Sequence, residues 1–187
     1  MILWIRQNFA KWKNMLSNQY QAYALLSSLN APARLIQHVR LVSEASDQLI
    51  RAYQALQVDI DRHWIEIGVI IHDLGKIQHP HELEGTGSAH ESSGQKILLD
   101  LGVPAHLARC CVSHAAWDLP DVSLEERTVA LADKLWKGKR VEELELLVID
   151  EIAQRLNQDR WAVFTILDHV FEQIALDADD RLRRSQV

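Results

Sequence analysis

The side chains best suited to chemistry in this sequence are an adjacent histidine and aspartate, His72 and Asp73, which follow the apolar run 67–71. Burying an imidazole beside a carboxylate is costly unless each group finds a partner or a metal ion. One such pair is weak evidence, because dipeptides of this kind often arise by chance. The pair belongs to a longer series, since further candidate ligands occur on other predicted helices: His38, His90, His114 and Asp133.

Each of these side chains could instead be a polar core residue with its own hydrogen-bond partner. For His38 or His114 alone we favour that interpretation, since histidine is intermediate in burial. For the set it fails, because four histidines and two aspartates would each need a separate solution in one small core. One or two divalent cations satisfy all of them together, and imidazole plus carboxylate suits several metals. We expect two ions, Fe or Mn first, with Co, Ni, Zn or Mg as alternatives.

The elements that position these residues are predicted to be helices. Apolar residues recur at helical spacing, and no segment alternates with period two over a convincing length. The helices expected around the candidate ligands cover approximately 30–56, 61–74, 89–101, 104–117 and 123–137, and two more follow at 140–156 and 159–178. The pattern predicts an all-α fold, a single bundle-like domain of seven or eight helices.

Length, composition and charge exclude several classes of protein. The chain has 187 residues, of which 48% are hydrophobic and 25% charged, as in an ordinary globular domain. Its formal net charge of −6 provides no overall basic footprint for a long nucleic acid. No apolar run is long enough to span a membrane, and the two cysteines are adjacent, so no disulfide framework is expected. We expect a cytoplasmic protein without membrane contact.

The segments outside the candidate ligands are less informative. Residues 2–29 carry apolar side chains at helical spacing, and we expect them to pack on their own domain, with a homo-oligomer contact through this N-terminal helix as the alternative. Residues 75–88 read as a loop that faces the substrate or forms a lid. The polar tail 179–187 is expected to be frayed.

The ligand series resembles the HD-domain superfamily of metal-dependent phosphohydrolases, which are helical proteins. The superfamily signature is a first His, a His-Asp pair and a later Asp, and its two-metal branch adds two histidines before the last Asp. The segment HDLGKI (72–77) is close to that branch's His-Asp-Ile-Gly-Lys form, and HESSGQKIL (90–98) is similar to its H-x-x-x-G-x-x-I-L segment. Of its His-His-Glu-x-Trp-Asp segment, the chain keeps only His114, Trp117 and Asp118.

The resemblance spans roughly residues 30–140. It divides the single domain 1–187 into an N-terminal helical extension (1–30), a metal-binding HD core (31–140), C-terminal helices (141–178) and the frayed tail (179–187). The Gly-Tyr-Pro extension of cyclic dinucleotide phosphodiesterases is absent, which argues against a cyclic dinucleotide substrate.

The resemblance also implies a role for each ligand. Asp73 would bridge two cations, of which one also takes His38, His72 and Asp133 and the other takes His90 and His114. A water molecule held between two cations loses a proton near neutral pH and becomes the nucleophile. The cations would then neutralise phosphate oxygens during in-line attack.

Basic side chains near the ligands are candidates to bind the substrate. Lys76 could hold a non-bridging phosphate oxygen, or it could be a solvated lysine that offsets the helix dipole. A basic cluster follows Asp133 and contains Lys134, Lys137, Lys139 and Arg140. It could hold distal phosphates of a nucleotide, with Trp136 as a stacking face, or it could be a solvated helix end.

These observations predict a phosphohydrolase that acts on a nucleotide or another small phosphorylated metabolite. The first alternative is a di-iron oxygenase, because some relatives that share the ligand series resemble such enzymes and the ligands alone do not separate the two. The second alternative is a module that binds a nucleotide without turning it over. A complete ligand set argues against the second alternative, because a retired site would be free to lose its ligands.

Overall fold

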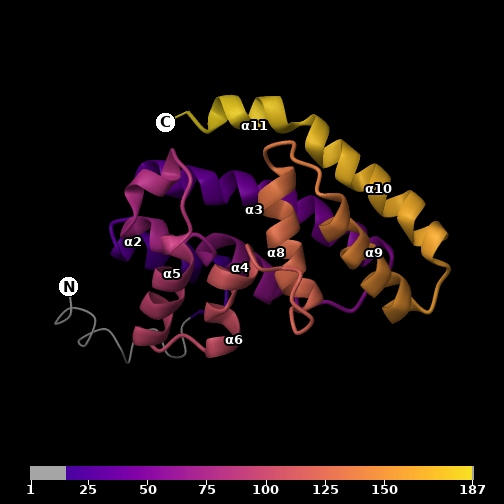
Figure 1. Cartoon of the computed structure of the whole chain (residues 1–187), viewed down its shortest axis with the longest axis horizontal. Coiled ribbons are helices and arrows are strands. Elements are labelled where there is room, and N and C mark those ends of the chain that lie inside the picture. Colours follow the sequence, from indigo (N-terminus) through magenta and orange to yellow (C-terminus); the bar gives the residue numbers. More distant parts are fainter. Residues whose placement is uncertain (1–15, 187) are drawn as a thin grey trace.

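The computed structural model describes residues 16–186, so residues 2–15 of the expected N-terminal stripe lie outside it. Within those residues the chain is helical and has no strand, which confirms the all-α prediction (Figure 1). None of these helices is both long and apolar enough to cross a membrane. The elements are α2 (Gln19–Ser28), α3 (Ala33–Ala55), α4 (Arg62–Ile71), η1 (Leu74–Ile77), η2 (Pro80–Leu83), α5 (Ala89–Asp100), α6 (Ala105–Ala108), α7 (Cys110–Ser113), α8 (Leu124–Leu135), α9 (Glu142–Leu156), α10 (Arg160–Leu176) and α11 (Ala178–Arg184).

Helix α4 is the centre of the fold. It begins at Asp61, whose carboxylate caps the helix by accepting a hydrogen bond from the backbone amide of Trp64 at 2.9 Å. The helix packs against α2, α3 and α8, which leaves nearly all of its apolar residues buried. A helix that is apolar on most sides belongs in the interior, so its C-terminal end delivers the next residues to the middle of the protein.

Two apolar clusters flank α4 and share it. Ile65 and Val69 face the larger cluster, which α3, α8, α9 and α10 complete. Ile67, Ile70 and Ile71 face the smaller one, which contains residues from α2, α5, α6 and α7. Because α2 contributes to the smaller cluster, the described part of the N-terminal segment is integral to the core of the domain.

Helix α4 ends at Ile71, three residues before the predicted end, and a 3₁₀ turn, η1, follows. At this turn the chain approaches α5 closely at two glycines, Gly75 and Gly94. A Cβ atom on Gly75 would lie 1.9 Å from the carbonyl oxygen of His90 and 2.7 Å from the amide nitrogen of Gly94. Only glycine permits this contact, and it connects the His72-Asp73 turn directly to the start of α5.

The prediction of a frayed tail over 179–187 is wrong for most of its length, since α11 extends to Arg184. Arg181 has only 2% of its surface exposed, and its guanidinium donates to the carbonyl oxygens of Trp136 and Ile174. Arg184 forms an ion pair with Glu44 on α3. Helix α11 therefore links the C-terminal end of α8 to α3, across the end of the bundle (Figure 1).

Candidate metal centre

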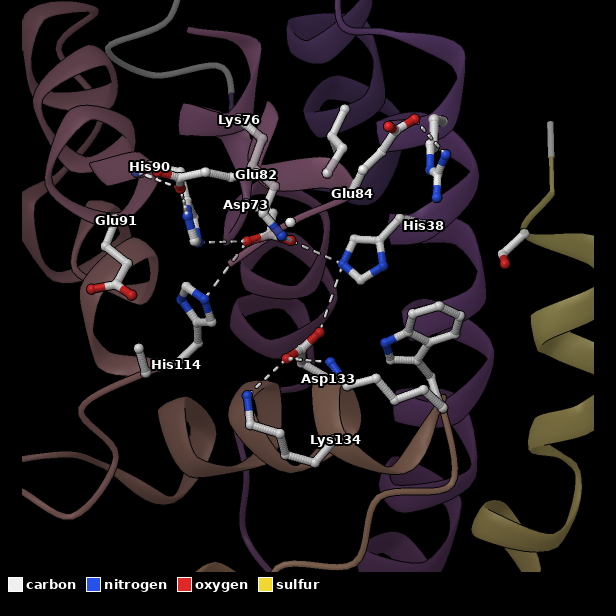
Figure 2. A pocket seen from close by; sticks show the side chains of 17 residues that line it. His38, Asp73, Lys76, Glu82, Glu84, His90, Glu91, His114, Asp133 and Lys134 are labelled. Atoms are coloured by element: carbon white, nitrogen blue, oxygen red, sulfur yellow. Dashed lines mark hydrogen bonds and ion pairs between the residues drawn. The ribbon is translucent and has the colours of Figure 1, made fainter. Parts of the chain in front are cut away.

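The structure brings all six predicted ligands to one buried site, although they come from five separate parts of the chain. They are His38 on α3, His72 and Asp73 after α4, His90 in the first turn of α5, His114 after α7 and Asp133 on α8. Five of them are classed as buried, and the His38 side chain is 13% exposed. Figure 2 shows His38, His90 and His114 arranged around the carboxylate of Asp73.

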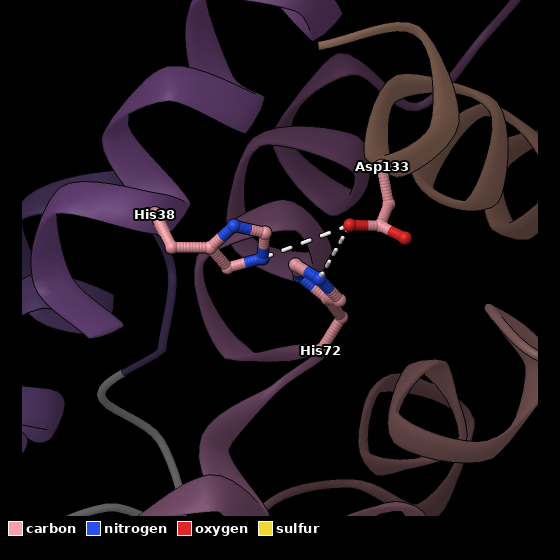
Figure 3. Close-up of side chains that lie close together, drawn as sticks. All are labelled: His38, His72 and Asp133. Atoms are coloured by element: carbon pink, nitrogen blue, oxygen red, sulfur yellow. Dashed lines mark ion pairs between the residues drawn. The ribbon is translucent and has the colours of Figure 1, made fainter. Parts of the chain in front are cut away.

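One carboxylate oxygen of Asp73 faces the first group of ligands. Asp73 Oδ2 lies 3.0 Å from His38 Nε2 and 3.5 Å from His72 Nε2. Asp133 Oδ1 completes this group, at 3.6 Å from His38 Nε2 and 3.8 Å from His72 Nε2 (Figure 3). The ligand atoms of His38, His72 and Asp133 lie within 4.8 Å of one another, close enough for one cation to contact all three, and so do those of His72, Asp73 and His114.

The other carboxylate oxygen of Asp73 faces the second group. Asp73 Oδ1 lies 3.1 Å from His90 Nε2 and 3.7 Å from His114 Nε2. The carboxylate thus stands between two pairs of imidazoles and presents a different oxygen to each pair, which is the geometry of a bridging ligand.

The polar atoms that these groups leave unpaired fit a metal site. Among the described residues, His38 Nε2, His72 Nε2, His90 Nε2 and Asp73 Oδ1 are buried and have no hydrogen-bond partner. Buried polar atoms nearly always have a hydrogen-bond partner, so four unpaired atoms in one cluster need a common explanation. A divalent cation supplies it, because all four are lone-pair donors suited to such an ion.

Hydrogen bonds to the opposite ring nitrogens hold three of the imidazoles in the orientation that metal binding needs. His72 Nδ1 lies 2.7 Å from the carbonyl oxygen of Val69, and His114 Nδ1 lies 3.1 Å from that of Cys110. A carbonyl only accepts, so Nδ1 carries the proton in both rings and Nε2 keeps its lone pair. Such partners orient metal-binding histidines and raise their basicity.

The third orienting partner is Glu82, which lies in the segment 75–88 predicted as a lid or substrate-facing loop. Its side chain is only 3% exposed, and Oε2 lies 2.5 Å from His90 Nδ1. The same carboxylate accepts from the backbone amides of Ala89 and His90, at 3.1 Å and 3.2 Å, and so caps the start of α5, where the Ser88 side chain makes no capping hydrogen bond. No spacing rule marks Glu82, because its role arises when η2 folds back on α5.

Electrostatic interactions keep the carboxylates ionised at this site. Burial acts to raise the pKa of Asp73, but His72, His38 and His90 outweigh it and hold that pKa well below its usual value. The pKa of Asp133 is likewise held well below its usual value, because His72, Lys134 and Lys137 outweigh the effect of burial. Both carboxylates are therefore ready to bind a cation without first losing a proton.

The histidines differ in how strongly they hold a proton. Burial is the main cause that lowers the pKa of His38, and it lowers that of His114 to about 3, with a contribution from His72. Burial also disfavours the charged form of His90, but Asp73 and Glu82 outweigh it and raise its pKa. Of these three histidines, His90 therefore holds a proton most strongly.

Three of the predicted substrate-binding lysines lie beside the ligands. Lys76 Nζ is 2.6 Å from Asp73 Oδ2, while Lys134 and Lys137 lie 2.9 Å and 3.7 Å from Asp133 Oδ2. All three line a cavity of about 390 Å³ above the ligands (Figure 2). This volume is at the lower end of the range for small-molecule sites.

The other two predicted substrate contacts lie elsewhere, which corrects that part of the prediction. Lys139 is exposed and does not line the cavity. The guanidinium of Arg140 is bound by Glu145 at 2.7 Å and by Asp168 at 2.5 Å, also away from the cavity. Trp136 lines the cavity, but only 8% of its surface is exposed, so its ring face is not open for stacking.

The fold and this cluster define a helical domain built around a histidine and aspartate metal centre. The HD domain family matches residues 35–136, a range that contains all six ligands, and the chain belongs to that family. Membership indicates the superfamily of metal-dependent hydrolases. An uncharacterized protein of Methanocaldococcus jannaschii is 27% identical over 154 residues, which cover 74% of this chain and 83% of that protein. No solved structure gives a significant match.

Proposed function

We propose that the protein is a phosphohydrolase that cleaves a phosphate ester or anhydride of a nucleotide or another small phosphorylated metabolite. The observation that carries the proposal is that the two carboxylate oxygens of Asp73 face different pairs of imidazoles. Oδ2 faces His38 and His72. Oδ1 faces His90 and His114. Such an arrangement suits two divalent cations, for which we propose Fe or Mn because the donors are imidazole nitrogens and carboxylate oxygens.

The bound cations would supply a water molecule of lowered pKa and would neutralise phosphate oxygens. The chain's own lysines would add to this neutralisation, since Lys76, Lys134 and Lys137 all line the cavity beside the ligands. Their ammonium groups now face Asp73 and Asp133, and an incoming phosphate is a further acceptor for them. These three lysines, which lie among the carboxylates of the cavity, offer ammonium donors to a phosphorylated substrate, and they are the reason to place hydrolysis before oxygen chemistry.

Phosphate release with added Mn, Fe, Co or Mg tests the proposal directly. We would compare the wild type with Asp73→Ala on mononucleotides, dinucleoside polyphosphates and small phosphate esters. Asp179→Ala is the matched control, because Asp179 is exposed and does not line the cavity. We expect metal-dependent release in the wild type and the control, and loss of release and of most bound metal in Asp73→Ala with the helical circular dichroism retained.

Metal and activity retained in Asp73→Ala would refute the bridging role. If the wild type releases no phosphate with any metal, the hydrolase proposal fails, and iron content with oxygen consumption would then test the oxygenase alternative.

A further inference from the structure

The cavity continues beyond the metal ligands along α3. Arg34 lies one helical turn before His38, so the two side chains share a face at a separation of about 5–6 Å between Cβ atoms. Both line the same cavity, together with Trp136 and Lys137 from the end of α8. This group of Arg34, Trp136 and Lys137, which we term the distal subsite, is not explained by metal binding, although Lys137 also approaches Asp133.

The distal subsite contains a donor that has no acceptor. Trp136 is only 8% exposed, it lines the cavity, and its Nε1 is buried without a hydrogen-bond partner in the described part of the chain. The indole lies edge-on to the ring of His38, at 5.1 Å between centroids, which places it next to the first ligand group. An indole nitrogen only donates, so its partner must be an acceptor, either a water molecule or an oxygen of a bound molecule.

The charges that line the cavity are unevenly distributed. Arg34 and Lys137 line the cavity, where Arg34 pairs with Glu84. The carboxylate of Glu91 lies beside His114 (Figure 2). A substrate anion near Arg34 and Lys137 gains two cationic partners, although Arg34 must first leave Glu84, whereas an anion near Glu91 meets a carboxylate.

Resting on the proposed function, we infer that the substrate carries a second anionic group, a phosphate or a carboxylate, which the distal subsite binds while the scissile phosphate lies at the metal centre. Arg34 and Lys137 supply the charge and Trp136 Nε1 supplies a directed hydrogen bond. The class of substrate is a doubly anionic phosphorylated metabolite, and an ester whose only anionic group is the scissile phosphate is a poorer one.

Glu84 provides an internal competitor for this anion. Its carboxylate lies 2.9 Å from Arg34 Nη1, and the two side chains are 73% and 47% exposed. An ion pair this exposed is weak, so a substrate anion held nearby by other contacts can replace it. Removing the charge of Glu84 and removing that of Arg34 must therefore act in opposite directions on the same substrate.

The test compares matched substrates that differ by one anionic group: phosphoglycolate against ethyl phosphate, and a nucleoside bisphosphate against the corresponding monophosphate. The quantity is the ratio of kcat/KM for the doubly anionic over the singly anionic member. We expect a ratio above one in the wild type and a fall of about fivefold in Arg34→Gln, less than a fully buried charged hydrogen bond would give because Arg34 is half exposed.

We expect the ratio to fall also in Trp136→Phe, which removes the N–H donor, and to rise in Glu84→Gln. Arg183→Gln removes a charge from an arginine whose side chain is 76% exposed and which does not line the cavity, so it serves as the control and leaves the ratio unchanged. The two substrate pairs separate the sources of the anion, since one adds a carboxylate and the other a phosphate.

A wild-type ratio near one, or a ratio that Arg34→Gln and Glu84→Gln leave unchanged, would overturn the inference while leaving the hydrolase intact. If no substrate is turned over at all, the proposed function fails separately. The inference is then decided by calorimetric binding of phosphoglycolate and ethyl phosphate to the metal-loaded protein: equal affinities overturn it, and tighter binding of phosphoglycolate that weakens in Arg34→Gln supports it.

Discussion

Replacing Glu82 tests whether the two halves of the metal centre are separable. Both of its carboxylate oxygens accept hydrogen bonds, Oε2 from His90 Nδ1 and the His90 amide, and Oε1 from the Ala89 amide. In Glu82→Gln one of these oxygens becomes an NH₂ group that faces a donor. In the better of the two amide orientations, the Gln oxygen accepts from His90. The variant then lacks the negative charge and the hydrogen bond from Ala89, but its side chain still orients the imidazole of His90.

The expected loss is confined to one cation. Partners that orient a metal-binding histidine contribute about tenfold to hundredfold in affinity. Glu82→Gln should thus weaken the second cation by about tenfold, and Glu82→Ala, which frees the ring of His90, by about a hundredfold. The first cation should bind as before, because His38, His72 and Asp133 make no contact with Glu82.

The assay is calorimetric titration with Mn²⁺, together with metal content after dialysis. We expect two binding events in the wild type. Only one of them, which we assign to the second cation, should be shifted in the Glu82 variants. Glu143→Gln on the exposed side of α9 is the control and should match the wild type. Equal weakening of both events, or no change in either, would refute the assignment of Glu82 to His90 alone.

Three further predictions follow from the same geometry. Gly75→Ala should lower the free energy of unfolding by about 3 kcal/mol or more, because its Cβ would collide with the His90 carbonyl oxygen, and urea denaturation measures this. Arg181→Ala should lower it by about 2–4 kcal/mol, because the buried carbonyls of Trp136 and Ile174 lose their donor, whereas exposed Arg183→Ala should not. Mn²⁺ affinity should fall as the pH drops through the raised pKa of His90, since its proton must leave; a pH-independent affinity, with no proton release between buffers of different ionisation enthalpy, would contradict this.

The sequence predicts the all-α fold and the six candidate ligands that the structure brings together, because both leave local signals. Apolar periodicity marks the helices, and Ser123 and Glu126, which have the spacing of a capping box, form both of its hydrogen bonds at the start of α8. Each ligand lies on the inward stripe of a helix or at a helix end. A signal of this kind depends only on neighbours within a few residues along the chain.

The features that sequence reasoning missed depend on distant contacts. Glu82 is buried because η2 packs back against the start of α5. The composition of residues 75–88 alone predicts only a loop. The tail is helical because Arg181 reaches the carbonyl of Trp136, 45 residues earlier in the chain. Arg140 is drawn from the basic cluster by Asp168, 28 residues later. None of these partners is visible in a local pattern.

The end of α4 explains how two neighbouring residues can serve one centre. Successive side chains on a helix diverge by about 100°, so a continuous helix through Asp73 would direct His72 and Asp73 to different places. The helix instead ends at Ile71, and Asp73 adopts φ −100° and ψ 13°, a conformation common at active sites. Gly75 then packs on the backbone of His90, so this contact brings the second pair of imidazoles to the far oxygen of Asp73.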